Sequence, residues 1–397
     1  MLRLGVLQHE SPIPRRYDRP VRPPQFSREL PPGGRRGVEC TAPNHPDPNS
    51  FRLQEADMTI SGFGGYVLTS CAAVAALAGC GGQSRVAPTG GAPQLLAVTT
   101  ATREKSWMLS EAKSEDLLYV TSIVSSYVFV FSYPEGKLVG TLGGVNYAAT
   151  GECSDKQGNV FVIGVQEIVE YAHGGSNPIA TLRSDNYPNG CAVDPVSGNL
   201  AVAGGSPHDF EANVAIFPHE KGPPTLYYNA AAPAFDFCTY DDRGNLFVNE
   251  YGSPEFGLDE LANGSSSLTR INISQKSQTI SAGGAVQWNG TYLVLGDPHG
   301  NGQGRHGPTT IYQVAVSGST GRVVKTIELF SGKAEHGKPD RNPGTPVEFW
   351  IQGKTIVNPL RYHRDVAFWR YPSGGYPTKK ILGVLLPYGV TVSLAPK

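Results

Sequence analysis

The sequence predicts an all-β fold, and three observations predict it. A strand–turn–strand motif recurs along the chain, most neighbouring copies lie 40–46 residues apart, and turn-forming residues are frequent. The 397 residues include 48 glycines and 32 prolines, which are both common in turn-rich β proteins. The net charge of −1 indicates no large basic surface, so nucleic acid is not expected as a partner.

Each copy of the motif has a short apolar strand, a polar turn and a second strand of alternating pattern. The copies lie at 151–164, 190–204, 237–250 and 285–297, with a weaker one at 348–359. Their turn glycines are Gly158, Gly198, Gly244, Gly290 and Gly353, spaced 40, 46, 46 and 63 residues apart. Asp and Asn side chains bond to the backbone of a tight turn, and glycine accepts its positive φ. Alternation with a period of two is typical of half-buried antiparallel strands.

A third apolar strand follows the motif, and a more variable fourth strand such as 178–184 comes after it. The third strands are expected at 168–171, 214–217, 311–314 and 366–369. Four short antiparallel strands in about 40–50 residues are typical of one blade of a β-propeller. A pair of β-sandwiches is the alternative fold.

The first unit lacks its first strand. Segments 116–122, 127–134 and 137–143 match second, third and fourth strands, and no first strand precedes them. Residues 389–393, near the end of the chain, match a first strand. We therefore expect the C-terminal strand to complete the first blade and close a ring of six blades over residues 106–397, with order beginning near Ser106 or Leu117.

The best copy of the repeat runs Tyr187-Pro188-Asn189-Gly190-Cys191-Ala192-Val193-Asp194 and continues with Gly198-Asn199-Leu200. This pattern resembles the NHL-repeat family of six-bladed β-propellers, and the resemblance covers Leu117–Lys397. Phrases such as DLLYV, YPEGKLVGTL and VQWNGTY are similar to those of a group of uncharacterised exported bacterial proteins. The resemblance implies a fold and no particular function, because propellers include enzymes, binders and scaffolds.

The N-terminal part differs from the repeats. Residues 1–57 hold ten prolines, nine arginines and no lysine, which predicts either a disordered tail or translated upstream DNA, with Met58 as the start. Residues 58–79 then form a signal peptide, whose apolar run 67–79 is too short to span a bilayer. Residues 80–105 form a flexible tether.

The residues Leu77-Ala78-Gly79-Cys80 resemble the lipobox of bacterial lipoproteins, in which the cysteine is acylated and becomes the N-terminus. The resemblance implies an exported protein that is anchored to the cell envelope by lipid on Cys80, at the outer membrane or cell surface. One departure is that no lysine or arginine lies between Met58 and Cys80. The alternative is an alanine-rich buried helix that happens to contain Cys80.

Four polar residues are expected near the central channel: Glu152, Asn189, Asp236 and Glu348. Lactonases of the gluconolactonase type use Glu, Asn and Asp there to hold Ca²⁺ or Zn²⁺, and such oxygen ligands suit a hard cation. The alternative is a polar, solvated channel mouth. We expect these side chains in or near the mouth without one compact coordination site, because their depths along the axis differ.

Three cysteines, Cys153, Cys191 and Cys238, fall at nearly the same position of consecutive first strands. We expect small apolar side chains packed between blades. A Cys153–Cys191 or Cys191–Cys238 disulfide is the first alternative, and a three-thiolate metal site is the second.

The insertion at 297–308 carries Asp297, His299, Arg305 and His306, and is expected to be a surface loop that could also bind a metal. No nucleophile elbow or phosphate-binding loop identifies an enzyme. The sequence therefore predicts a binding or protein-interaction module of the cell envelope, with a small ligand or an envelope protein as its partner and no cofactor. The alternatives are a metal-dependent lactonase or esterase and a scaffold in an outer-membrane assembly.

Overall fold

The computed structural model describes residues that all lie in the unit Pro88–Lys397. The described residues are 106–125, 127–143, 145, 149–184, 187–205, 212–251, 256–274, 280, 284–297, 309–333, 339–340, 348–361 and 363–397. The predicted tail, signal peptide, Cys80 and tether lie outside them, as do His299, Arg305 and His306. In the described part of the chain, no helix has the length and hydropathy needed to cross a membrane.

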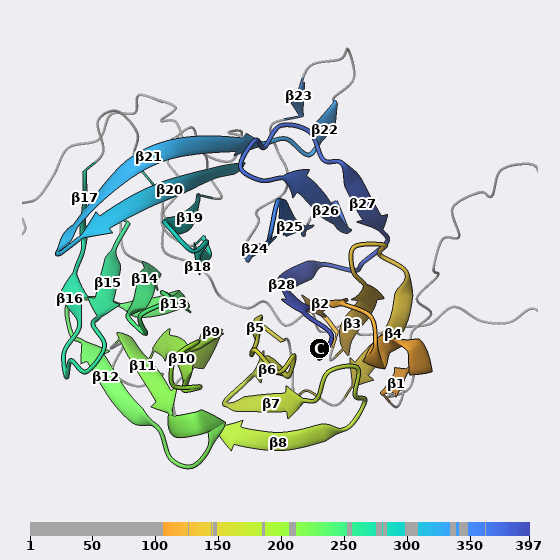
Figure 1. Ribbon diagram of the computed structural model, residues 1–397, viewed down its shortest axis with the longest axis horizontal. Helices are drawn as coiled ribbons and strands as arrows, with labels where there is room; N and C mark the ends of the chain where they lie inside the picture. The colour runs from red at the N-terminus through yellow and green to blue at the C-terminus, as the bar shows by residue number, and fades with distance from the viewer. Residues whose placement is uncertain are drawn as a thin grey trace, which may run out of the picture. The chain divides into compact units, whose positions relative to one another are not determined.

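The described strands of this unit form a ring of six antiparallel blades around a central axis (Figure 1). Four strands of each blade follow one another from the inner to the outer edge, which confirms the predicted fold class. Blade 2 holds β5 (Gly151–Ser154), β6 (Val160–Gly164), β7 (Glu167–Tyr171) and β8 (Pro178–Arg183). Blade 3 holds β9 (Tyr187–Val193), β10 (Leu200–Gly205), β11 (Ala212–Phe217) and β12 (Thr225–Asn229).

The next three blades repeat this order with small additions. Blade 4 holds β13 (Ala234–Tyr240), β14 (Leu246–Tyr251), β15 (Leu258–Leu261) and β16 (Thr269–Arg270). Blade 5 holds β18 (Val286–Trp288), β19 (Leu293–Asp297), β20 (Thr309–Ser317) and β21 (Thr320–Leu329), and β17 (Asn272–Ser274) adds to β21 in parallel. Blade 6 holds β24 (Trp350–Gln352), β25 (Thr355–Leu360), β26 (Asp365–Arg370) and β27 (Lys379–Leu382). The pair β22 (Gly332–Lys333) and β23 (Pro339–Asp340) forms a separate two-stranded sheet.

Blade 1 is built from both ends of the described chain. Its inner strand is β28 (Pro387–Ser393), followed outward by β2 (Leu117–Ser122), β3 (Tyr127–Ser132), β4 (Leu138–Gly143) and β1 (Trp107–Met108). β28 pairs antiparallel with β2, which confirms the predicted closure by the C-terminal strand. Val390 and Val392 of β28 are buried in a cluster with Leu118, Val120 and Val357, so the closure is also a hydrophobic contact between blades 1 and 6.

The turn acids perform the structural role that the repeat predicts. Asp155 accepts hydrogen bonds from the backbone N–H of Asn159 at 2.7 Å and from its side-chain Nδ2 at 2.8 Å. Asp241 accepts the same pair of bonds from Asn245 at 2.9 and 2.8 Å. Gly158 adopts a φ of +85° between the two strands, a value that an L side chain disfavours. Each turn therefore fixes where its inner strand ends, and these ends surround the central axis.

Candidate functional site

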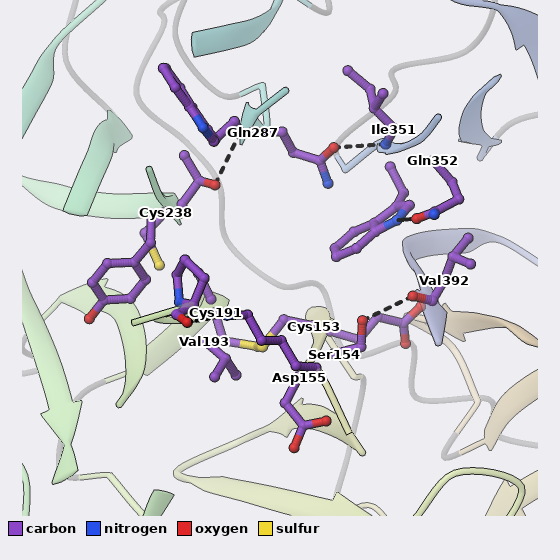
Figure 2. A pocket seen from close by; sticks show the side chains of 18 of the residues that line it. Cys153, Ser154, Asp155, Cys191, Val193, Cys238, Gln287, Ile351, Gln352 and Val392 are labelled. Atoms are coloured by element: carbon purple, nitrogen blue, oxygen red, sulfur yellow. Dashed lines mark hydrogen bonds between the residues drawn. A yellow bond between two sulfur atoms is a disulfide. The ribbon is translucent and has the colours of Figure 1, made fainter. Parts of the chain in front are cut away.

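A cavity of about 590 Å³ follows the axis of the ring and is lined by the inner strand of every blade (Figure 2). One lining residue from each of blades 1 to 6 is Val392, Cys153, Cys191, Cys238, Gln287 and Ile351, in that order. The turn residues Asp155 and Asp194 line the cavity at the trailing ends of inner strands, together with Leu394 and the residues after it. Glu152 and Glu348 line it near the leading ends of their strands. The cavity thus runs along the inner strands and reaches the face that carries the first turns.

Blades 2 and 3 are joined by a disulfide between Cys153 of β5 and Cys191 of β9, which Figure 2 shows at the cavity wall. The expectation that both cysteines are free apolar packing residues is therefore wrong, and one of the two alternative disulfides is present. Inner strands of neighbouring blades bring equivalent positions to a Cα–Cα distance of 5.7 Å, inside the range that a disulfide needs. Cys238 stays a buried thiol, and burial raises its pKa to about 12.

The predicted channel residues occupy alternate blades and lie deeper than expected. Glu152, Asp236 and Glu348 belong to blades 2, 4 and 6 and are only 0%, 4% and 6% exposed. The alternative of a solvated channel mouth therefore does not describe these three buried carboxyl groups. Asn189 is half-buried and its Nδ2 donates to the Phe235 carbonyl at 3.0 Å, which leaves it outside the cavity lining.

Bulges at the leading ends of three inner strands contain Asn189, Asp236 and Gly389. Asn189 is the extra residue of a bulge in β9, and Asp236 lies in a bulge of β13, where the register shifts between Phe235 and Cys238. A third bulge in β28 contains Gly389. A bulge turns a side chain away from the face that simple alternation assigns to it. A Cβ at Gly389 would collide with Oε2 of Glu348, so this position requires glycine.

Burial makes the three carboxyl groups poor acids. It raises the pKa of Glu152 and of Glu348 well above the usual carboxyl value, and that of Asp236 to about 7. The Glu348 pKa is raised further by the negative charges of Glu152 and Asp236. Nearby backbone N–H groups, those of Thr121 and Thr391 for Glu152, act in the opposite direction and are outweighed. Each of the three groups therefore favours its protonated form more strongly than a carboxyl group in water does.

Three oxygen atoms of this cluster have no hydrogen bond of ordinary geometry. They are Oε1 and Oε2 of Glu152 and Oε2 of Glu348. A buried polar atom without a partner costs free energy, so such atoms are rare in folded proteins. Among the described residues, no set of three or more His, Cys, Asp or Glu side chains is arranged to hold a metal ion. Asp297 of the insertion is buried and accepts a hydrogen bond from the Tyr312 hydroxyl at 3.4 Å.

Two tryptophans form part of the cavity wall, and sequence reasoning missed them. Trp288 ends β18 of blade 5 and Trp350 begins β24 of blade 6, and both are half-buried. Trp288 donates its indole N–H to Oδ2 of Asp242 at 2.9 Å, and Trp350 donates to Oε1 of Gln352 at 3.4 Å. Their position in the repeat could have predicted this role, because each tryptophan lies in the first strand of its motif and first strands surround the central axis.

A hydrogen bond between the two strands places these tryptophans on one stretch of wall. Oε1 of Gln287 accepts the backbone N–H of Ile351 at 2.7 Å, which Figure 2 shows as a dashed line. Since the indole N–H groups already have protein acceptors, the part of each ring that is left for a ligand is apolar.

The fold and this cavity define the chain as a six-bladed β-propeller, and comparison with solved structures agrees. It is similar to a structure titled "Crystal structure of Nidogen/Laminin Complex", with a TM-score of 0.53, 12% identity, and coverage of 71% of this chain and 100% of the other. For Kuenenia stuttgartiensis hydrazine synthase the TM-score is 0.50, the identity 12%, and the coverage 76% and 100%. For a protein of unknown function from Bacteroides caccae these values are 0.50, 10%, 70% and 99%.

No protein-family model and no curated protein matches the sequence. Identities of 10–12% establish the fold alone. The resemblance to NHL repeats and to exported lipoproteins stays a prediction.

Proposed function

We propose that this protein is a binding module that takes a small ligand into its central cavity. The observation that supports this most is the cavity of about 590 Å³ whose wall receives residues from all six inner strands. This volume lies within the range of roughly 300–1,000 Å³ that is common for small-molecule sites. A ligand there touches every blade, so the rigid ring holds the recognising groups in fixed positions.

The groups on the wall suit recognition by shape and by a few polar contacts. Trp288 and Trp350 provide apolar ring surface, and their indoles are oriented by bonds to Asp242 and Gln352. Glu152 and Glu348 also line the cavity. A mainly apolar cavity with a few placed polar groups is the usual form of a ligand site.

The proposal is tested by screening the full-length protein against a small-molecule library by thermal shift, followed by calorimetry on the compounds that stabilise it. We expect at least one compound whose affinity falls at least tenfold in Trp350→Ala. The matched control is Trp107→Ala, because Trp107 lies on the outermost strand of blade 1 and does not line the cavity. Equal losses in both variants would contradict the proposal. Metal-dependent hydrolysis of a lactone panel would replace it with the enzyme alternative.

We also propose that the protein works in the bacterial cell envelope, anchored by lipid on Cys80. The lipobox-like Leu77-Ala78-Gly79-Cys80 supports this. The Cys153–Cys191 disulfide supports it independently, because disulfides persist mainly in oxidising compartments outside the cytoplasm.

A further inference from the structure

The carboxyl pair of the cavity has the features of a site whose partner is a ligand. Glu152 is fully buried and neither of its carboxyl oxygens makes a hydrogen bond of ordinary geometry, although the backbone N–H groups of Thr121 and Thr391 lie nearby. Oε2 of Glu348 also lacks a bond of ordinary geometry. Both residues line the cavity. Buried carboxyl oxygens are normally satisfied by protein groups or water, so this pair can still accept hydrogen bonds from a ligand.

The titratable groups around the pair are acids. Negative charge on Glu152 and Asp236 raises the pKa of Glu348. Negative charge on Glu348 raises the pKa of the Cys238 thiol, and negative charge on Glu152 raises that of the Tyr119 phenol. Each of these groups is neutral or negative in its two states. In the part of the chain that the structure describes, no lysine, arginine or histidine forms an ion pair with Glu152, Asp236 or Glu348. Each of these acids that ionises therefore attracts a positive charge at this end of the cavity.

The two acids that line the cavity at the trailing end, Asp155 and Asp194, are already engaged with the protein. Asp155 accepts bonds from Asn159, and Asp194 accepts the Val196 N–H at 2.9 Å and a bond from the hydroxyl of Ser197. Lys156 donates to the carbonyl of Pro195, and Lys397 also lines the cavity at this end. The carboxyl groups of Glu152 and Glu348 are therefore better placed to hold an ammonium group than Asp155 and Asp194.

We propose that the cavity binds an organic cation, an amine whose ammonium group is held by Glu152 and Glu348 while its carbon chain lies against Trp288 and Trp350. The inference rests on the proposed binding function and names its ligand class. An ammonium group supplies up to three N–H donors to these carboxyl oxygens. The faces of the indole rings attract cations and apolar chains. A cavity of about 590 Å³ has room for the carbon skeleton, which a bare metal ion lacks.

Binding of such a cation exchanges it for protons. Burial raises the pKa of both Glu152 and Glu348, so the empty site favours the protonated form of each. When the ammonium group arrives, a carboxylic acid becomes a carboxylate and its proton leaves to the solvent, so one positive charge replaces another. Affinity therefore rises with pH until the carboxyl groups of the empty protein are themselves ionised.

The test is calorimetry on the full-length protein with matched ligand pairs, hexylamine against hexanol and choline against 3,3-dimethylbutanol. We expect the amine to bind at least tenfold more tightly than its neutral counterpart, and more tightly at pH 8 than at pH 6. Repeating the titration in two buffers of different ionisation enthalpy measures the protons, and we expect net release. Choline lacks N–H donors, so weaker binding than hexylamine identifies hydrogen bonding at the carboxyl pair.

Variants locate the site. We expect Glu152→Gln and Glu348→Gln each to lower amine affinity at least tenfold and to reduce proton release. The matched control is Glu135→Gln in an exposed turn of blade 1, which should leave both unchanged. If the glutamine variants fail to fold, the inference is still tested by the unaltered protein, through the pH dependence of its amine affinity and the protons that it releases on binding.

The inference is overturned if an amine and its neutral counterpart bind equally, if no amine binds, or if Ca²⁺ binds while amines do not. The proposed binding function has its own test. It stands if a neutral library compound binds less tightly to Trp350→Ala, and it fails if no library compound loses affinity in that variant.

Discussion

Val390 lies directly opposite Val120 in the ladder that closes the ring, and both side chains are fully buried. The two valines come from opposite ends of the propeller sequence, so this contact within blade 1 joins the two ends of that sequence and closes the ring. Burying a valine contributes on the order of 1.5 kcal/mol or more, against a total stability of roughly 5–15 kcal/mol.

Deleting residues 388–397 is therefore expected to open the ring. The deletion removes Val390 and Val392 and leaves the edge of β2 unpaired, so the product should be insoluble or melt at a markedly lower temperature. Removing only Pro396 and Lys397, which are exposed and follow the last strand, is the control. A long deletion with an unchanged melting temperature would show that β28 does not stabilise the ring.

Breaking the disulfide is expected to destabilise the propeller by about 2–4 kcal/mol, the usual range for a native disulfide. Cys153→Ala and Cys191→Ala should each show this loss in urea unfolding, and the double variant should lose little more because only one bond is involved. Alkylation of the unfolded, unreduced protein should label Cys238 and spare the other two. Labelling of Cys153 and Cys191 in a freshly purified, oxidised sample would contradict the bond.

Stability should fall as pH rises from about 5 to 8. The pKa of Asp236 is raised by burial to about 7, so the folded state holds a proton that the unfolded state releases at lower pH. The contribution of this proton is complete below the ordinary carboxyl pKa and is lost as pH rises through about 7. Glu152 and Glu348 act in the same direction, because the pKa of each is raised.

Asp236→Asn isolates this effect, because an amide of similar shape does not titrate. Urea unfolding of both proteins at pH 5 and pH 8 should show a smaller fall in the variant. Other groups titrate in both proteins and cancel in this comparison; Asp241, for example, has a lowered pKa and the opposite sign. Equal falls would mean that Asp236 is not held in its neutral form.

Lipidation of Cys80 predicts a specific N-terminus. Mass spectrometry of protein from the envelope fraction should find no peptide from residues 1–79, and the N-terminal peptide should begin with an acylated Cys80. Cys80→Ser should move the protein out of the membrane fraction, and Cys71→Ser is the matched control within the predicted signal peptide. Abundant peptides from the arginine-rich 1–57 segment would contradict both the anchor and the later start.

The fold was predictable because each repeat is specified by interactions between residues that are close in the sequence. The turns at Asp155 and Asp241 use the same pair of bonds to an asparagine, and six blades of one kind leave few ways to pack. The missing first strand at 116–122 and the spare strand at 389–393 together predicted the closure. The added strands β1 and β17 were not predicted, because each has only two or three residues and no pattern can show in so short a segment.

The site was predicted less well, because it depends on relations between blades. Glu152, Asp236 and Glu348 were placed in the channel region, but their burial was not predicted, and the bulge that contains Asp236 is not revealed by a pattern of alternation. The choice between packed thiols and a Cys153–Cys191 bond depends on the angle between neighbouring blades. The sequence shows Trp288 and Trp350 in two different repeats, and only the closed ring shows that both line the central cavity.

The order in which the closing strands leave the ribosome has a consequence for the cell. β2 is made early, and its inner edge has to wait for β28 while the 264 intervening residues, 123–386, are translated. At about 5–20 residues per second, that wait is on the order of ten seconds to a minute. During this interval the unfinished ring exposes an unpaired strand edge and apolar side chains. A nascent chain of this protein therefore needs protection from aggregation until its last strand has been made.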